Sequence, residues 1–589
     1  MTNLRFTSNN PKPSPKSSMD FPTKQDASIG TCSSKLSLYD QPENDELEEY
    51  IEFMEHLMTI RVKPCESIKP RIIIDPPDDG DKKMKQPMRK SLFAHVPPFI
   101  IFKNQKNSSK LPAEITRHLL WWRPGNYTPR IIVSTVLKSG FRTSNKSTSN
   151  WCGTWCSNHA YSKLKSTNVF SKVSCFPSCI QLGDKISLWT NFRKMRRKFG
   201  SKNFDYIPLT FVLPEERNGL RKFMRRNDGV WIVKPPAACA GHGIKVVTRL
   251  QEIPDRKSLV AQRYITRPHL LDGIKFDIRL YVLLTSIDPL RIYLYKEGLV
   301  RLATVKYIHD VRHLTNKFMH LTNTSVNKFS PNFQPNDSPD ECKGNMWSLK
   351  SLWNYLSTME GVNILELWNK IKDLTIKTMI SAEAALVNAS KRTTLSSYNF
   401  YQLFGFDVLL DGQYRPWLLE VNDYPSMEPD TPLCKLVKGQ LAKDYLNLVG
   451  FHVPDLLNGK ELKILRMICK QNGVCYDRQL YSNLVSWKDR RKQYIHEKMN
   501  NRKTYLKTIL KRLTPDDVRV LIRHEDEITQ TGGFEKIFPT SETYRYLGFF
   551  EKVRYYNLLL DAWEKEYGQN RSVGIQKLRT LCRRKYHLS

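Results

Sequence analysis

Short runs of apolar residues alternate with polar turns through the middle of the chain, and they predict a set of β-strands. The runs lie at 96–102, 130–137, 230–235, 243–248, 259–265, 276–285, 291–304, 404–411 and 415–422. Their β-branched and aromatic content favours strands. A long helix is expected from Ile364 to Ala389, and a basic helix from Trp189 to Phe199. Closely spaced strands interrupted by helices predict an α+β, or mixed α/β, fold.

The two ends of the chain differ from this middle part. Residues 1–40 are too poor in apolar residues to fold, and they precede an acidic amphipathic helix near 47–58 and a Pro- and Lys-rich linker at 75–90. From about residue 460 the pattern is helical and basic. We therefore expect a largely disordered region at 1–90, an N-terminal subdomain at 91–225, central and C-terminal subdomains at 226–455, and a basic helical extension at 456–589.

The net charge narrows the classes of partner. The chain has 93 Lys and Arg against 58 Asp and Glu, a formal charge of +35. Such an excess predicts a polyanionic partner, which could be nucleic acid, an anionic membrane or an acidic protein. The sequence has no basic finger module, so an acidic protein is favoured. No run of 18 apolar residues and no apolar leader segment is present, so neither a membrane span nor secretion is expected.

The cysteines allow two interpretations. A chain of this size with 12 cysteines and no secretion signal is typical of a protein with reduced thiols. One group could bind zinc: Cys152, Cys156, His159, Cys175 and Cys179. Their spacing is looser than that of zinc ribbons or fingers, and free cysteine is a common buried apolar residue. Buried thiols are therefore the favoured interpretation.

Two neighbouring strand patterns end in carboxylates. Asp407 lies in the first run, Glu420 and Asn422 lie in the second, and a turn at Asp411–Gly412 predicts that the two strands form a hairpin. The three side chains would then converge. Oxygen ligands on rigid strands suit Mg²⁺ that carries nucleotide phosphates. The alternative is that these acids are solvated or paired with lysine.

Lys234 ends a buried strand pattern, and a loop with Gly241 and Gly243 follows it. A lysine that leaves a buried strand is costly unless it meets an anion, and glycines allow backbone N–H groups to approach phosphates. A tight hairpin would explain the glycines equally well.

The segment Lys275 to Arg279 alternates charged and apolar residues. On a strand, Lys275, Asp277 and Arg279 would share one face, while Phe276 and Ile278 would face the core. Such a face predicts a polar cavity, which Arg301 could join from a similar strand. A solvent-exposed edge is the alternative.

Seven motifs in this order resemble the tubulin–tyrosine ligase-like family, in particular its tubulin polyglutamylase branch, nearest to the type-four members. They are WIVKPP (231–236), QRYI (262–265), KFDIRLYV (275–282), LVR (299–301), HLTNTS (320–325), FGFD (404–407) and LLEVN (418–422). The similarity extends from about residue 91 to the C-terminus.

This resemblance implies an ATP-grasp core with ATP and Mg²⁺ as cofactors. By position, the nucleotide contacts would be Lys234, Gly241, Gln262, Arg263, Tyr264, Ile265, Lys275, Phe276, Asp277, Thr322 and Asn323. The metal ligands would be Asp407, Glu420 and Asn422. The amino-acid substrate would lie at Arg301, Ser325 and Lys438, and the catalytic residues would be Arg279, Arg301 and Glu420.

The implied activity is ATP-dependent ligation of free L-glutamate to a glutamate side chain of the acidic tubulin tail, through an acyl phosphate and an isopeptide bond. The resemblance also implies a cytoplasmic, microtubule-associated protein, with cilium and centriole as candidate sites, and no nucleic-acid or membrane partner. The basic segment 487–513 has ten Lys and Arg against two acidic residues. We expect it to bind microtubules, in particular through Lys488, Arg490, Arg491 and Lys492.

Four departures from the family pattern leave alternatives open. Ala240 replaces an arginine, Thr324 an aromatic residue, Met346 a lysine, and Asp423–Tyr424 a short run before Pro-Ser. The alternatives are a catalytically weak microtubule-binding scaffold, or a ligase that uses glycine or an acidic acceptor other than tubulin. Because the nucleotide and metal positions are intact, we predict an active but divergent ligase.

Overall fold

The computed structural model describes residues 88–104, 110–122, 128–144, 150–156, 168–237, 241–393, 396–470, 474–481, 485–499 and 501–589. The segments expected at 1–40 and 47–58, nearly all of the linker, and the residues His159 and Ala240 lie outside these ranges. Within them, no helix combines the length and apolar character that crossing a membrane requires.

An eight-stranded sheet organises the fold, and its hub is the long strand β12. The strands are β11 (Leu270–Leu271), β12 (Ile274–Ile287), β13 (Leu290–Tyr295), β14 (Leu299–Leu302), β15 (Met346–Ser348), β16 (Gln402–Leu410), β17 (Pro416–Asn422) and β18 (Phe534–Phe538). Strand β12 pairs antiparallel with β11, β13, β14 and β16, and β16 pairs with β17. The site residues expected on separate motifs are therefore neighbours across one sheet.

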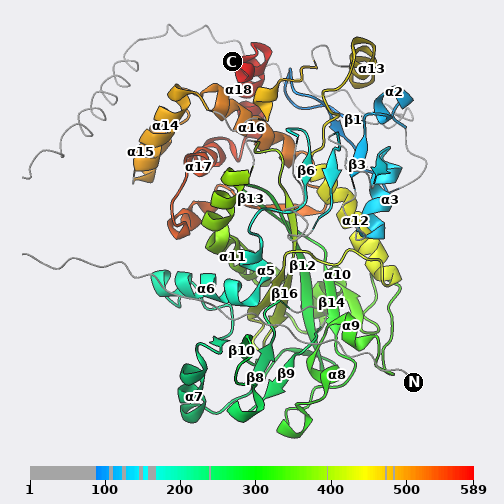
Figure 1. Cartoon of the computed structure of the whole chain (residues 1–589), viewed down its shortest axis with the longest axis vertical. Helices are drawn as coiled ribbons and strands as arrows, with labels where there is room; N and C mark the ends of the chain where they lie inside the picture. The colour runs from blue at the N-terminus through cyan, green and yellow to red at the C-terminus, as the bar shows by residue number, and fades with distance from the viewer. Residues whose placement is uncertain are drawn as a thin grey trace, which may run out of the picture. The chain divides into compact units, whose positions relative to one another are not determined.

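Helices cover both faces of this sheet (Figure 1). On one face lie α5 (Ile180–Gly183), α6 (Lys185–Phe199), α10 (Leu349–Met359) and α11 (Ile364–Thr393). On the other lie α3 (Arg130–Lys138) and α12 (Pro432–Val449). Phe276 and Ile278 belong to the apolar cluster on the face covered by α5, α6, α10 and α11. Tyr281 and Leu283 belong to the cluster on the face covered by α3 and α12. Strand β12 is thus apolar on both faces from Leu280 to Leu284, and polar on one face before it.

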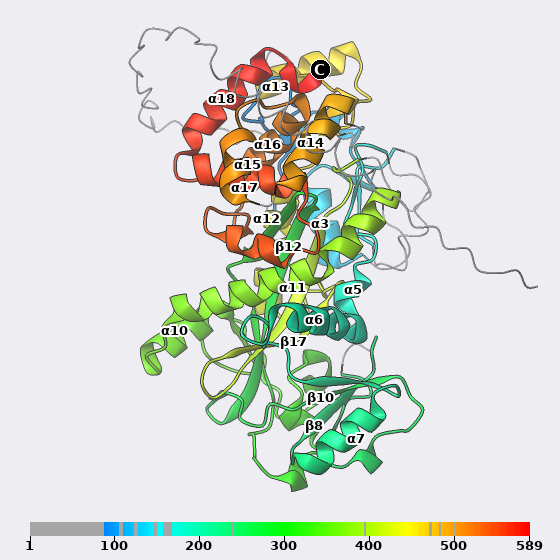
Figure 2. The same ribbon diagram turned by 90° about the vertical axis from the view of Figure 1, so that its left-hand side faces the viewer.

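A smaller antiparallel sheet lies in the lower part of Figure 2. Its strand order is β7 (Thr210–Leu213), β10 (Leu259–Arg263), β8 (Trp231–Lys234) and β9 (Lys245–Val247), and α7 (Arg217–Arg226) packs on it. The β8–β9 connection carries Gly241 and Gly243, with φ of +76° and +71°. These are backbone conformations that glycine adopts without strain.

The remaining short elements complete the core. A parallel sheet is formed by β4 (Arg142–Ser144), β3 (Leu120–Trp122), β5 (Gly153–Thr154) and β6 (Lys172–Val173), and a two-stranded sheet by β1 (Met88–Arg89) and β2 (Phe99–Ile100). Short helices are α2 (Ala113–Thr116), α8 (Lys317–His320) and α9 (Thr324–Asn327), and 3₁₀ helices lie at 250–252, 311–313, 478–480, 543–549 and 586–588.

The C-terminal part is mainly helical, as expected. Its helices are α13 (Gly459–Cys469), α14 (Trp487–Lys498), α15 (Arg502–Thr508), α16 (Pro515–Ile528), α17 (Tyr555–Tyr567) and α18 (Arg571–Arg583). The Thr514 hydroxyl caps α16 by accepting from Asp517 N at 3.3 Å. This part is joined to the central sheet because β18 pairs with β13. The expected subdomain boundaries remain predictions.

Three details of the sequence prediction are wrong. The run at 291–304, expected as a single strand, forms two strands, β13 and β14, which both pair with β12. Residues 130–137 form helix α3 and not a strand: Ile131, Ile132, Thr135 and Val136 are buried at helical spacing, so the β-branched content was misleading. The β16–β17 loop spans five residues instead of two, because Asp411 N donates to Arg415 O at 3.1 Å.

The expected binding role of Lys492 is also contradicted. Lys492 is buried, and its ammonium donates to Ile509 O, Arg512 O and Asp517 Oδ2 at 2.9, 2.7 and 2.7 Å. It holds α14 against the helices beside it. Lys488, Arg490 and Arg491 are exposed, and only these three of the four remain available to a partner.

Candidate active site

The strand register brings the charged side chains of four strands together. Asp277 of β12 lies opposite Arg301 of β14, and Arg279 of β12 lies opposite Asp407 of β16. Asp407 in turn lies opposite Glu420 of β17. Asn422 follows two residues after Glu420 and therefore shares its face of the strand. This arrangement confirms the predicted pairing of the two strands that end in carboxylates.

The two arginines and two aspartates form a buried ion network. Arg301 Nε and Nη2 contact Asp277 Oδ1 and Oδ2 at 2.8 and 2.5 Å, and Arg301 Nη2 also lies 2.9 Å from Asp407 Oδ2. Arg279 Nε and Nη2 donate to Asp407 Oδ1 and Oδ2 at 2.5 and 3.0 Å. Burial by itself raises the pKa of Asp407, but the two guanidinium groups overcome it and hold this pKa far below its usual range. Asp407 is therefore ionised and fixed in orientation.

These side chains line one cleft between the two antiparallel sheets, with a volume of about 110 Å³. The site residues expected from the sequence that line it are Lys234, Gly241, Lys275, Asp277, Arg279, Arg301, Thr322, Asn323, Asp407, Glu420 and Asn422. Residues from β8 and the following loop thus face residues from β12, β14, β16 and β17.

Two buried lysines face the cleft without a carboxylate partner among the described residues. Lys234 Nζ donates to Gln262 Oε1 at 2.8 Å, and Lys275 Nζ donates to Tyr264 OH and His320 O at 3.0 and 2.9 Å. Burial lowers the pKa of Lys234 to about 8 and that of Lys275 to about 7. Buried cations with neutral partners are suited to an incoming anion such as a phosphate.

A narrow chamber of about 10 Å³ adjoins the cleft and shares Lys185, Lys234 and Leu419 with it. Its other walls are Leu188, Trp189, Ile207, Thr210, Val260 and Gln262. Gln262 is fixed there because its amide donates to Thr210 Oγ1 at 3.0 Å. Apolar and polar groups line the chamber together, and its walls would have to move apart to admit a nucleotide base.

The donor set at the carboxylate end suits a hard cation. Asp407, Glu420 and Asn422 supply carboxylate and amide oxygens to the same cleft, and Mg²⁺ prefers such ligands. Glu420 Oε2 lies 3.2 Å from Lys185 Nζ, so both carboxylates contact cations. Within the described ranges no group of three or more His, Cys, Asp or Glu side chains is arranged to hold a metal. The candidate set is therefore two carboxylates and one amide.

Residues 162–459 match the model of the tubulin-tyrosine ligase family. The chain belongs to this family. It is 39% identical over 542 residues to tubulin monoglutamylase TTLL4 of Homo sapiens, covering 90% of this chain and 45% of the human protein. It is 34% identical over 555 residues to tubulin polyglutamylase ttll-4 of Caenorhabditis briggsae, covering 94% and 90%. The chain thus spans less than half of the human relative. The predicted α+β fold with an ATP-grasp core is confirmed.

Six expected site residues line neither cavity of this ligase-family fold. The guanidinium of Arg263 donates to Asp228 O at 2.7 Å, and Lys438 Nζ donates to Glu428 O at 2.7 Å. Phe276 packs in the core. The others are Tyr264, which supports Lys275, and Ile265 and Ser325. Their roles toward ligands remain predictions.

Sequence reasoning missed three polar residues of the family cleft, Lys185, His242 and His320. Lys185 begins α6, and Asp184 caps this helix by accepting from Ser187 N at 2.8 Å. The capping residue in the sequence could have placed the start of the helix, and with it Lys185. His320 opens the HLTNTS motif, and its Nδ1 lies 2.9 Å from Tyr264 OH. It therefore fixes the hydroxyl that accepts from Lys275.

The four described cysteines of the candidate zinc group are buried thiols. Cys175 Sγ and Cys179 Sγ are 3.4 Å apart, and Cys179 Sγ lies 3.4 Å from Asp423 Oδ2. Burial raises the pKa of Cys152 and of Cys156 to about 12. Metal binding requires thiolates, which these surroundings disfavour.

Proposed function

We propose that this protein is an ATP-dependent protein–glutamate ligase that modifies the acidic tails of tubulin. The observation that carries the proposal is the cleft in which Lys234 and Lys275 face Asp407 and Glu420. The names of the human and nematode relatives, a tubulin monoglutamylase and a tubulin polyglutamylase, support the choice of substrate. They leave open whether a chain of glutamates is started or extended.

The cleft residues divide into three roles. Lys234 and Lys275 bind nucleotide phosphates, and Gln262 borders the base. Asp407, Glu420 and Asn422 would hold Mg²⁺, which would neutralise phosphate charge during transfer. Arg279 and Arg301 keep Asp407 ionised and present fixed positive charge beside it. Such preorganised charge stabilises a developing anion without reorganisation in the transition state.

An oxygen of the acceptor carboxylate attacks the terminal phosphorus of ATP, the bond from that phosphorus to the bridging oxygen breaks, and ADP leaves an acyl phosphate behind. The amine of free glutamate attacks the acyl carbon, the carbon–oxygen bond to phosphate breaks, and the amine loses a proton. The product is an isopeptide bond. We assign to Arg301, which lines the cleft, the binding of a carboxylate of the incoming amino acid.

A ligase that uses glycine is the second candidate, and Met346 favours it. Met346 lies opposite Arg301 in the sheet, and its Sδ is 3.3 Å from Cys434 Sγ. An apolar cluster of Leu299, Met346, Leu433, Cys434 and Val437 therefore borders Arg301. Lys438 follows this cluster but is bound to Glu428 O. An apolar wall tolerates glycine better than a second carboxylate.

Mass spectrometry of tubulin tests both candidates. The purified protein is incubated with microtubules, ATP, Mg²⁺ and either glutamate or glycine. Glutamyl increments on the tubulin tails support the proposal, and glycyl increments support the second candidate. Microtubule pelleting without incorporation of either amino acid would leave only a binding scaffold.

We propose the microtubule cytoskeleton of the cytoplasm, including cilium or centriole, as the location of this protein, with no nucleic-acid or membrane partner.

Nucleotide affinity is expected to fall as the pH rises above 7, and more steeply above 8. Burial lowers the pKa of Lys275 to about 7 and that of Lys234 to about 8, so each side chain is charged below its own pKa and neutral above it. If only the charged forms bind phosphate, each lysine costs about tenfold in affinity for every pH unit above its pKa. Calorimetric titration with Mg²⁺–ADP between pH 7 and 9.5 measures the slope. Lys234→Met should bind weakly with a flatter profile, and an equal slope in both proteins contradicts the assignment.

A further inference from the structure

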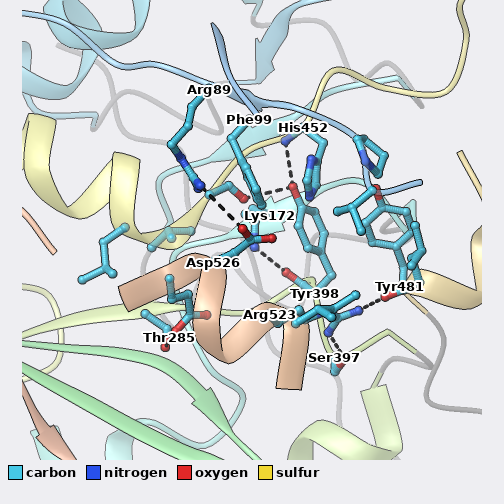
Figure 3. Close-up of a pocket in the computed structure, with 18 of the residues that line it drawn as sticks. Arg89, Phe99, Lys172, Thr285, Ser397, Tyr398, His452, Tyr481, Arg523 and Asp526 are labelled. Atoms are coloured by element: carbon cyan, nitrogen blue, oxygen red, sulfur yellow. Dashed lines mark hydrogen bonds and ion pairs between the residues drawn. The ribbon is translucent and has the colours of Figure 1, made fainter. Parts of the chain in front are cut away.

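A second cavity lies far along the sheet from the nucleotide cleft and shares no lining residue with it. It has a volume of about 50 Å³ and is bounded by β6, the segment before β16, the start of β13 and helix α16. Figure 3 shows Lys172 at its centre, between Tyr398 and Asp526. Arg291, Ser397, Leu480 and Arg523 also line a larger adjoining cavity of about 340 Å³.

Most charges around the two cavities are matched. The pairs are Arg89–Asp526 at 3.8 Å, Arg291–Glu527 at 3.0 Å, Lys391–Asp288 at 3.2 Å and Arg519–Asp516 at 3.5 Å. These pairs use all four carboxylates in the linings. Two cations are left over, Lys172 and Arg523, and among the described residues neither has a carboxylate within 4.0 Å.

The partners of both leftover cations are neutral. Lys172 is 5% exposed; its Nζ donates to Tyr398 O at 3.0 Å and lies 3.5 Å from the centre of the Tyr398 ring. Arg523 donates to Ser397 Oγ and Leu480 O. Burial and the mutual repulsion of these cations lower the pKa of Lys172, and burial lowers that of Arg523 to about 10. Two like charges in one cavity are costly unless an anion joins them.

We propose that this cavity binds a small phosphate-bearing molecule, with the phosphate group between Lys172 and Arg523. A phosphate matches two cations because it carries up to two charges and several acceptor oxygens, and arginine binds it through parallel N–H groups. The adjoining cavity, with Ser286, Ser390 and Gln493 in its lining, has room for the remainder of the molecule. Arg523 is half-buried, which leaves the phosphate position in contact with solvent.

Binding joins β6 to α16, so it should raise the temperature of unfolding. The full chain is tested with inorganic phosphate and with pyrophosphate, at constant ionic strength. Because the nucleotide cleft also attracts phosphate, each measurement is repeated in a Lys234→Met background. We expect a concentration-dependent rise in the unfolding temperature in both backgrounds. In calorimetry, Arg523→Gln and Lys172→Met should each weaken phosphate binding at least tenfold.

Lys391→Met is the matched control, because it removes a cation that already has a carboxylate partner, Asp288; its phosphate affinity should stay unchanged. Arg523 is half-buried, so Arg523→Gln remains informative if Lys172→Met does not fold. A response that disappears in Lys234→Met but persists in Arg523→Gln places the ion in the nucleotide cleft and overturns the proposal. So does the absence of a response in the wild type to both probes, which would mean that Lys172 is buried in its neutral form.

Discussion

Replacing Glu420 with Gln is expected to reduce glutamate incorporation into tubulin by about three orders of magnitude, the loss typical of removing one group that stabilises transition-state charge. Glu420 lies opposite Asp407 in the sheet and lines the cleft that contains Lys234. Gln keeps the shape of the side chain but removes the negative charge that Mg²⁺ requires. Radiolabelled glutamate with ATP, Mg²⁺ and microtubules measures the rate.

Microtubule pelleting by Glu420→Gln should equal that of the wild type, since Glu420 lies in the cleft and not in the basic helices. Its carboxylate is 27% exposed and its partner is Lys185 at 3.2 Å, so only a small change in unfolding temperature is expected. Glu428→Gln is the matched control: Glu428 pairs with Arg130 at 3.2 Å outside the cleft. Incorporation at the wild-type rate by Glu420→Gln contradicts the metal role of this residue.

The charged face of β12 could be predicted because the alternation of charged and apolar residues that defines it lies within five consecutive residues. Lys275, Asp277 and Arg279 alternate with Phe276 and Ile278, and a period of two assigns opposite faces on any strand. The buried and cleft-lining positions agree with this assignment. The sequence predicted which side chains face the cleft but not their partners, because register is set by tertiary pairing. The ion pairs of Arg301 with both Asp277 and Asp407 were therefore not predicted.

The errors have a similar origin. In α3, Ile131, Ile132, Thr135 and Val136 fit a helix by spacing but a strand by composition, and packing against α12 decides for the helix. Strand β18 was missed because its five residues lie among helices and gain their hydrogen bonds only from β13. Propensity is a weak guide where tertiary contacts supply most of the stabilisation.

Tertiary contacts, and not the local sequence, also decide which basic residues of α14 are exposed to a partner. Lys488, Arg490 and Arg491 are exposed, and Trp487 beside them is 70% exposed. We expect the triple replacement of these cations by Glu to weaken microtubule binding about tenfold or more, since each exposed contact is worth about 0.5–1 kcal/mol. Cosedimentation at physiological salt measures the affinity, and the difference from wild type should shrink as salt rises.

Two controls separate binding from folding. The first control replaces three exposed cations of α13 by Glu: Lys460, Lys463 and Arg466. It changes the net charge of the protein as much as the α14 variant does. If α14 is the binding surface, the α13 variant should lose less microtubule affinity. Lys492→Glu should instead destabilise the fold, by about 3–5 kcal/mol for a broken buried pair, because Asp517 loses its partner at 2.7 Å. Unchanged cosedimentation of the α14 variant, or equal losses from the α13 and α14 variants, would remove α14 as the binding surface and leave only a general effect of net charge.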